Sequence, residues 1–280
     1  MKYSALDKLN LLANIYSRMF AAIFKFRTWL GFFILALFQA FGLFMLARFY
    51  LPGFYQITNP ILSMFVPGFM FHYPQYYLAL PSIYSGYENF ILGPTVWVIL
   101  SAFAVYRLGG YYSDNKPTAG ESFSIARKVY IPLLVFWALE TGLVLLVMFL
   151  STSIADDFVF GSPNRKIVLN LGLQFLAFGI SAFFLYTIPG VILGSKKLLT
   201  AIRESIGLCR KNFFLTFFII LIPGSIKTFI NLLLTEFSPK IVKFLNPELI
   251  LLLLGIQIFM GIFINLFIYG SAVFVYKKMS

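Results

Sequence analysis

Cysteine, histidine and charged residues are all scarce in this sequence of 280 residues. The only cysteine, Cys209, excludes an internal disulfide and a multi-cysteine metal site. The only histidine, His72, argues against a histidine-based zinc site. Charged residues make up 11% of the chain, far below the share in a soluble domain. The sequence therefore predicts no metal site and no cofactor.

Apolar residues dominate instead. Hydrophobic residues make up 60% of the chain and aromatic residues 19%, and the mean hydropathy is +0.87. This composition predicts an all-α integral membrane protein. A net charge of +12 would suggest nucleic acid as the partner of a soluble protein. Here Lys and Arg lie in short segments between apolar runs, as they do beside anionic lipid headgroups, so no nucleic-acid binding is expected.

Six apolar runs are long enough to cross ~30 Å of hydrocarbon as helices. We expect one membrane domain, residues 1–280, with spans at residues 29–50, 90–107, 129–151, 167–193, 213–235 and 249–276. Six spans place both termini on the side that holds most of the 22 Lys and Arg residues. The positive-inside rule identifies that side as the cytoplasm.

The segments between the spans are expected to be loops or surface helices. Residues 51–88 carry prolines and glycines at a density that a continuous crossing helix does not tolerate in lipid, which places them at the outer interface. A short helix over residues 59–71 is the alternative there. Exposed connections are expected at 152–166 and 236–248.

Basic amphipathic segments precede three of the spans. Glu121-Ser122 followed by Arg127-Lys128 recurs as Glu204-Ser205 followed by Arg210-Lys211, with the same spacing. Such a segment is typical of a helix that lies on the membrane surface and leads into a span. The pattern suggests three helix-hairpin units, 1–107, 116–193 and 197–280, in which Arg27 takes the place of Arg127. Any protein with an even number of spans and basic inner loops would look similar without being a repeat.

The amphipathic segments also predict which residues face the bundle. Residues 4–28 and 194–212 each place apolar and charged side chains on opposite helical faces. The predicted apolar faces consist of Leu9, Leu12, Ala13, Tyr16, Phe20, Ile23 and Phe24 in the first segment, and of Leu198, Leu199, Ile202, Ile206 and Cys209 in the second.

Seven basic residues of these segments form a predicted collar at the cytoplasmic face, which we call the basic collar. It would hold anionic lipid headgroups or a partner membrane protein. Its members are Arg127, Lys128, Lys196, Lys197, Arg203, Arg210 and Lys211.

Several short segments carry a family resemblance. Residues 186–194, 201–205, 210–214 and 116–123 resemble the pattern of a broad group of bacterial six-pass membrane proteins related to the membrane domain of glycerophosphoryl diester phosphodiesterases. The resemblance implies the six-span fold and a place in the bacterial cytoplasmic membrane. It implies no catalytic residue, because the 280 residues include no soluble phosphodiesterase barrel.

Polar residues inside the spans are the candidate functional residues, because each is costly in hydrocarbon. Glu140 and Lys227 lie at similar depths in their spans and could form an ion pair. Alternatively, Lys227 extends outward and Glu140 bonds to Asn170 or Gln174. Two further pairs, Pro189-Gly190 and Pro223-Gly224, are candidate hinges or simple kinks.

These features predict a permease-like or lipid-handling membrane subunit. The alternative is a membrane scaffold or assembly factor. No enzyme is expected, because Ser195 and Ser205 lack the Gly-x-Ser-x-Gly context of a nucleophile and no catalytic pair stands out. A Walker motif is absent, so energy-coupled transport would need an ATPase from another chain.

Overall fold

The computed structural model describes residues 5–48, 73–113, 115–159 and 163–279, together with positions 51, 56 and 60. The protein is all-α, and these described ranges contain no β-strand. The helices are α1 (Ala5–Ile23), α2 (Phe26–Ala47), α4 (Tyr76–Gly86), the π-helix η1 (Tyr87–Trp97), α5 (Val98–Tyr111), α6 (Ala119–Lys128), α7 (Tyr130–Val159), α8 (Pro163–Phe184), α9 (Thr187–Ile192), α10 (Leu198–Lys211), α11 (Phe213–Glu236), α12 (Ser238–Phe244) and α13 (Leu249–Met279).

Six segments of the described chain are long and apolar enough to cross a membrane, as predicted. They are Phe26–Ala47, Tyr76–Tyr111, Tyr130–Val147, Ile167–Ile192, Phe213–Glu236 and Leu249–Met279. Five begin within three residues of the predicted starts. The fold is therefore a multi-pass membrane bundle.

The second span departs from the prediction. It begins at Tyr76 and not near residue 90, because α4, η1 and α5 form one continuous helical run. The run contains Pro81, which was expected to break a crossing helix, and Pro94, which lies inside the predicted span. Pro94 lies in the π-helix, whose wider turn relieves the ring's clash with the preceding turn, and its carbonyl accepts a hydrogen bond from Tyr130 of α7 at 3.0 Å. Residues 76–88 thus belong to the bundle, whereas the expected helix over 59–71 lies outside the described residues.

The predicted loops after the third and fifth spans are also largely helical. The α7 helix continues to Val159 and α8 starts at Pro163, where residues 152–166 were expected to be an exposed connection. The short helix α12 occupies part of the expected loop 236–248, with Pro239 in its first turn, where proline is tolerated.

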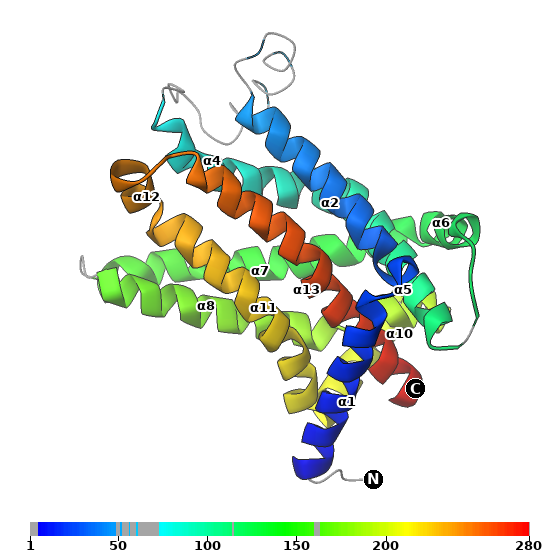
Figure 1. Cartoon of the computed structure of the whole chain (residues 1–280). Coiled ribbons are helices and arrows are strands. Elements are labelled where there is room, and N and C mark those ends of the chain that lie inside the picture. The colour runs from blue at the N-terminus through cyan, green and yellow to red at the C-terminus, as the bar shows by residue number, and fades with distance from the viewer. Residues whose placement is uncertain are drawn as a thin grey trace.

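The last helix, α13, is central to the bundle. It packs against α2 and α11 on its two sides and also against α1 and α5 (Figure 1). Its buried side chains Ile250, Leu254, Ile258 and Ile262 recur every four residues, which aligns them along one face. Neighbours on both sides of α13 can therefore pack against one helix.

The predicted pairing of surface helix and span is present in the structure. The α6 and α10 helices each end two residues before the start of the next span, at Tyr130 and Phe213. A small, fully buried side chain stands four residues before each of three span starts: Ala22, Ala126 and Cys209. In the first unit this alignment places Ile23, and not Arg27, at the position of Arg127. The predicted equivalence of Arg27 with Arg127 is therefore wrong.

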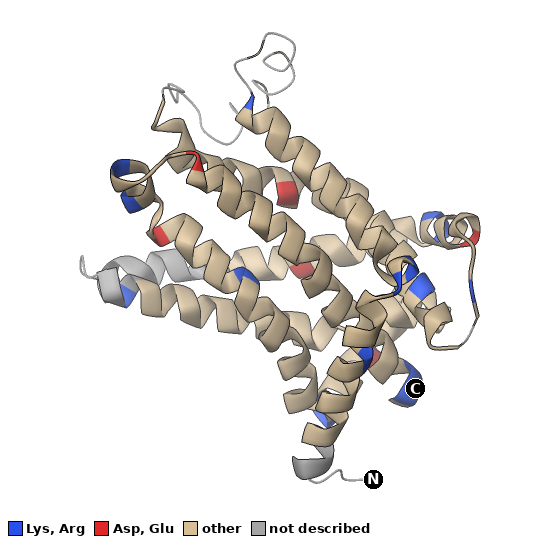
Figure 2. Cartoon of the chain, viewed as in Figure 1, with Lys and Arg blue, Asp and Glu red and all other residues tan. Residues whose placement is uncertain are grey.

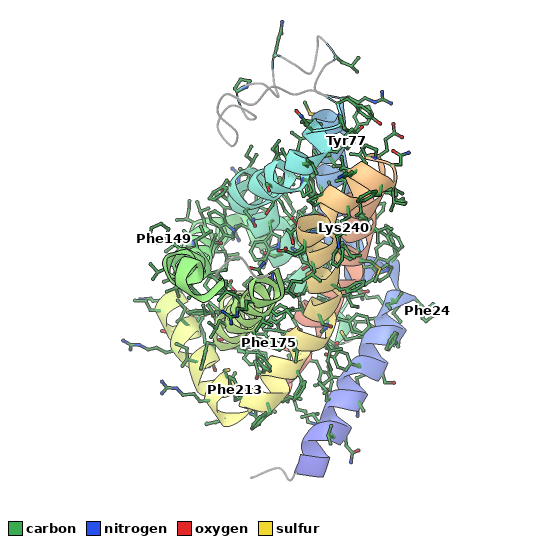
Figure 3. The ribbon with its side chains drawn as sticks, turned by 90° about the vertical axis from the view of Figure 1, so that its left-hand side faces the viewer. Phe24, Tyr77, Phe149, Phe175, Phe213 and Lys240 are labelled. Carbon is green, nitrogen blue, oxygen red and sulfur yellow. The ribbon has the colours of Figure 1, made fainter. Side chains whose placement is uncertain are left out.

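The amphipathic helices bury other side chains than predicted, except that Cys209 is buried as expected. The buried residues of α10 are Ala201, Ser205 and Cys209, while Leu199 is 71% exposed. In α1 the buried residues are Leu11, Ile15, Met19 and Ala22, and the predicted Leu9, Phe20 and Phe24 are exposed. Figure 3 shows Phe24 directed away from the bundle. Small residues allow close approach of helices, and large apolar side chains remain for lipid.

Charge is distributed unevenly along the bundle. Most Lys and Arg residues gather at the end formed by α1, α6, α10 and the last turns of α13, which we call the basic end (Figure 2). The opposite end carries α12 and the start of α4. Acidic and basic residues are few between the two ends.

Candidate functional site

Polar side chains from five helical segments converge between the two ends of the bundle. They line one cavity together with Ile258, Gly261 and Ile264 of α13. We call this group the polar cluster. Its members are Gln39 of α2, Tyr84 of α4, Glu88 of η1, Lys227 of α11, and Gln257 and Asn265 of α13.

Glu88 is the best-connected residue of the polar cluster. Gln39 Nε2 donates a hydrogen bond of 2.7 Å to Glu88 Oε1. Lys227 Nζ lies 3.8 Å from the same oxygen and forms a loose ion pair with it. The Lys227 side chain is 47% exposed and that of Glu88 22% exposed, so the carboxylate is the more enclosed partner.

The cluster lies near the middle of the spans. Gln39 and Lys227 stand 13 and 14 residues after the first residues of α2 and α11. At 1.5 Å per residue this is about 20 Å along either helix, within a hydrocarbon layer of ~30 Å. Charged groups at this depth are expensive, so a pair held there by several neighbours is a candidate for function.

The cavity is small, and two of the residues that line it carry a buried polar atom without a hydrogen-bond partner. Its volume is ≈ 30 Å³. Tyr84 is only 2% exposed, and its hydroxyl has no hydrogen-bond partner among the described residues. The Oε1 atom of Gln257 is also buried and unpaired there. The site can thus offer both a donor and an acceptor to a small polar molecule.

The predicted pairing of Glu140 with Lys227 is wrong. Lys227 pairs with Glu88, whereas the Glu140 carboxyl forms a side-chain hydrogen bond with Ser181 of α8. The α8 helix packs against both α7, which carries Glu140, and α11, which carries Lys227. Similar residue counts along two spans do not by themselves make the two side chains neighbours.

The alternative prediction, that Glu140 bonds a neighbouring polar side chain such as Asn170 or Gln174, is correct in kind, but the partner is Ser181. Asn170 donates a hydrogen bond of 2.9 Å to Glu236 Oε1. Gln174 Oε1 accepts a hydrogen bond of 3.3 Å from Thr228 of α11. Both residues therefore connect α8 to α11 and form part of the packing between these helices.

The two predicted hinges are buried and closely packed. Pro189 and Gly190 lie in α9, where all six residues are buried, and an added Cβ at Gly190 would lie 3.1 Å from the Ala201 methyl group. At Gly224 an added Cβ would lie 2.8 Å from the Phe178 ring. Both positions allow a close approach of neighbouring helices, and their role as hinges stays a prediction.

Six members of the basic collar are exposed at the basic end: Arg127, Lys128, Lys197, Arg203, Arg210 and Lys211. The seventh, Lys196, differs because its Nζ bonds both oxygens of Glu204 at 2.6 Å. This bond raises the pKa of Lys196. The charge of Lys196 is thus compensated inside the protein, which removes it from the surface available to lipid.

The twin motifs use their glutamates in different ways. Glu121 closes a capping box with Thr118 at the start of α6. Glu204 instead binds Lys196 and accepts a hydrogen bond from Tyr276 at 3.3 Å. The equivalent serines, Ser122 and Ser205, are both fully buried and bond backbone carbonyls, which explains their presence without a catalytic role.

Sequence reasoning missed most of the polar cluster. Only Lys227 was a candidate, because Glu88 was assigned to an interfacial segment and Gln39 and Gln257 stand alone in apolar runs. The signal for Glu88 was available: it lies between Pro81 and Pro94 in a run whose mean hydropathy is 1.6. Among the described residues, no three His, Cys, Asp or Glu side chains group as metal ligands.

The fold and the polar cluster define a six-span helical membrane protein with a polar site between its spans. No known protein family, curated protein or solved structure gives a match in comparisons with this chain. The family resemblance drawn from the sequence segments stays a prediction.

Proposed function

We propose that this protein is a permease-like membrane subunit that acts at the polar cluster. The observation that carries the proposal is the Glu88–Lys227 pair, which lies at mid-span and is surrounded by polar side chains from separate helices. Retaining such groups in hydrocarbon is costly, and a purely structural bundle could fill the same positions with apolar residues.

In this proposal, the basic end lies in the cytoplasm and the protein resides in the bacterial cytoplasmic membrane. The orientation rests on the positive-inside rule, and the compartment rests on the family resemblance. Both termini are then cytoplasmic. Any ATPase that drives transport would be a separate chain that contacts this end.

Labelling of single cysteines tests the permease-like function. The native Cys209 is fully buried and burial raises the pKa of its thiol to about 11, so a Cys209→Ala background removes little reactivity. In that background a permease exposes Gln257→Cys to a membrane-impermeant thiol reagent in intact membranes. The matched control is Phe259→Cys on the same helix, since Phe259 is 59% exposed on the apolar outer surface and should stay unlabelled.

Equal protection of both cysteines would contradict a permease. A cysteine at position 257 that is labelled only after detergent treatment would indicate a dry bundle, as expected for a scaffold or assembly factor.

Holding anionic lipid at the basic end is a second candidate function. The exposed collar residues lie beside large exposed apolar side chains, Phe123 at 52% and Leu199 at 71%. Cations next to apolar groups that can enter the bilayer are suited to phosphate headgroups at the interface.

Native mass spectrometry of gently solubilised protein tests this second function. Retained anionic lipid should be lost when Arg127, Lys128, Arg210 and Lys211 are neutralised. Neutralising Lys240 and Lys243, which lie at the opposite end on α12, is the matched control and should leave it bound. A co-purifying ATPase would support transport, whereas neither lipid nor partner would favour the scaffold.

A further inference from the structure

The cavity of the polar cluster has room for a small polar molecule. A cavity needs on the order of 10–15 Å³ to admit one water molecule. The volume of ≈ 30 Å³ is sufficient for one or two. A lipid headgroup or an organic solute would not fit in this arrangement of the helices.

Two residues that line the cavity carry unpaired polar atoms, one a donor and one an acceptor, which match the hydrogen bonds of water. Tyr84 is almost completely buried, and its hydroxyl can donate. Gln257 Oε1 can accept. A buried polar group without a partner costs free energy, and one water molecule can accept from Tyr84 and donate to Gln257. Both penalties are relieved by the same ligand.

Glu88 provides a third partner and a proton acceptor. The contacts from Gln39 and Lys227 both go to its Oε1 atom. The second hydrogen of the water can therefore bond the carboxylate. The ionisable groups that line the cavity with Glu88 are Tyr84 on α4 and Lys227 on α11, while α2 and α13 contribute the amides Gln39, Gln257 and Asn265.

We infer that the cavity holds a water molecule bound by Tyr84, Gln257 and Glu88, and that Glu88 is a proton-binding site reached through it. When a hydronium ion delivers its proton, an O–H bond forms on the Glu88 carboxylate and neutral water remains. The negative charge that holds Lys227 disappears in that step. The water and proton site do not depend on the proposed function. Only the role of the proton does: in a permease, this proton would be the coupling ion.

Thermal unfolding of Tyr84→Phe tests the water molecule. In a dry site, the change removes an unsatisfied hydroxyl and raises the melting temperature. In a hydrated site it removes a satisfied bond and lowers it, and we expect the second result. Tyr186→Phe is the matched control, since the Tyr186 hydroxyl lies 2.9 Å from the Thr216 hydroxyl and its loss must lower the melting temperature. A rise for Tyr84→Phe beside a fall for Tyr186→Phe would overturn the water site.

Infrared difference spectroscopy of the protein in lipid nanodiscs tests the proton. The chain has ten Asp and Glu residues, so several protonated carboxyl bands appear as the pH falls. One of these bands should be missing in Glu88→Gln and present in Glu140→Gln. Its frequency should shift in Tyr84→Phe and in Gln257→Leu. Protonated carboxyl bands that are all the same in wild type and in the variants at positions 84, 88 and 257 would overturn the inference. Because no flux is measured, a protonating Glu88 in a protein that fails the cysteine test would refute the permease and leave the proton site standing.

Discussion

Glu88 and Glu140 both lie within the spans, yet their surroundings differ. Glu88 bonds Gln39, pairs with Lys227 and lines a cavity with side chains of four other helical segments. Glu140 bonds one hydroxyl, that of Ser181 on the adjacent helix, and interacts electrostatically with Tyr269 of α13. One carboxyl group belongs to a site, and the other belongs to a contact between helices.

The difference shows that the cost of a carboxyl group in hydrocarbon does not by itself identify a functional residue. A single hydroxyl partner can offset part of that cost and fix the packing of two helices. Several polar groups converging from separate helices do more, since they also create a polar volume. Glu88 and Glu140 therefore differ in the number of separate helices that supply polar partners to the carboxyl group.

The largest effect is expected for Glu88→Leu. The change leaves the amide of Gln39 and the ammonium of Lys227 without their shared acceptor, and both lie in the span interior. We expect a loss of about 1–3 kcal/mol in the free energy of unfolding, measured by denaturant titration in detergent micelles. Glu140→Leu is the comparison. An equal loss for the two would remove the distinction between them.

A smaller effect is expected for Lys227→Met. Glu88 keeps its bond to Gln39 at 2.7 Å, whereas its ion pair with Lys227 is loose at 3.8 Å. The unfolding free energy should fall by about 1 kcal/mol or less, in the same titration. A loss greater than that of Glu88→Leu would mean that the lysine, and not the carboxylate, organises the site.

The smallest effect is expected for Glu140→Gln. A glutamine amide can retain the hydrogen bond with Ser181, and no charged partner is lost. The change in unfolding free energy should stay within about 0.5 kcal/mol, and labelling of Gln257→Cys should be unchanged. If this variant abolished the labelling, Glu140 would have to be added to the site.

The positions of the spans could be predicted from the sequence because apolar runs of the required length are read directly. The start of the second span was misplaced because the prolines of residues 51–88 were judged together as helix breakers. Pro81, one of them, lies inside α4, and the helical run continues past it through Tyr87 and Glu88. That error concealed the central residue of the site.

Side-chain partners could not be predicted for a different reason. Residue counts along a span give depth but not direction around the bundle axis, so Glu140 and Lys227 were matched across α8. The prediction of the buried faces of α1 and α10 failed because lipid accepts large apolar side chains as readily as a protein interior does. Hydrophobicity therefore did not identify Ala201 and Ser205 as the packing residues of α10.

The most direct test of the central claim is a pair of double-mutant cycles on the unfolding free energy. One cycle combines Glu88→Gln with Lys227→Met, and the other combines Glu140→Gln with Lys227→Met. We predict a coupling energy of about 0.5 kcal/mol or more in the first cycle and additivity within about 0.3 kcal/mol in the second. Coupling of Lys227 to Glu140 together with additivity toward Glu88 would contradict the polar cluster as described and restore the pairing suggested by depth alone.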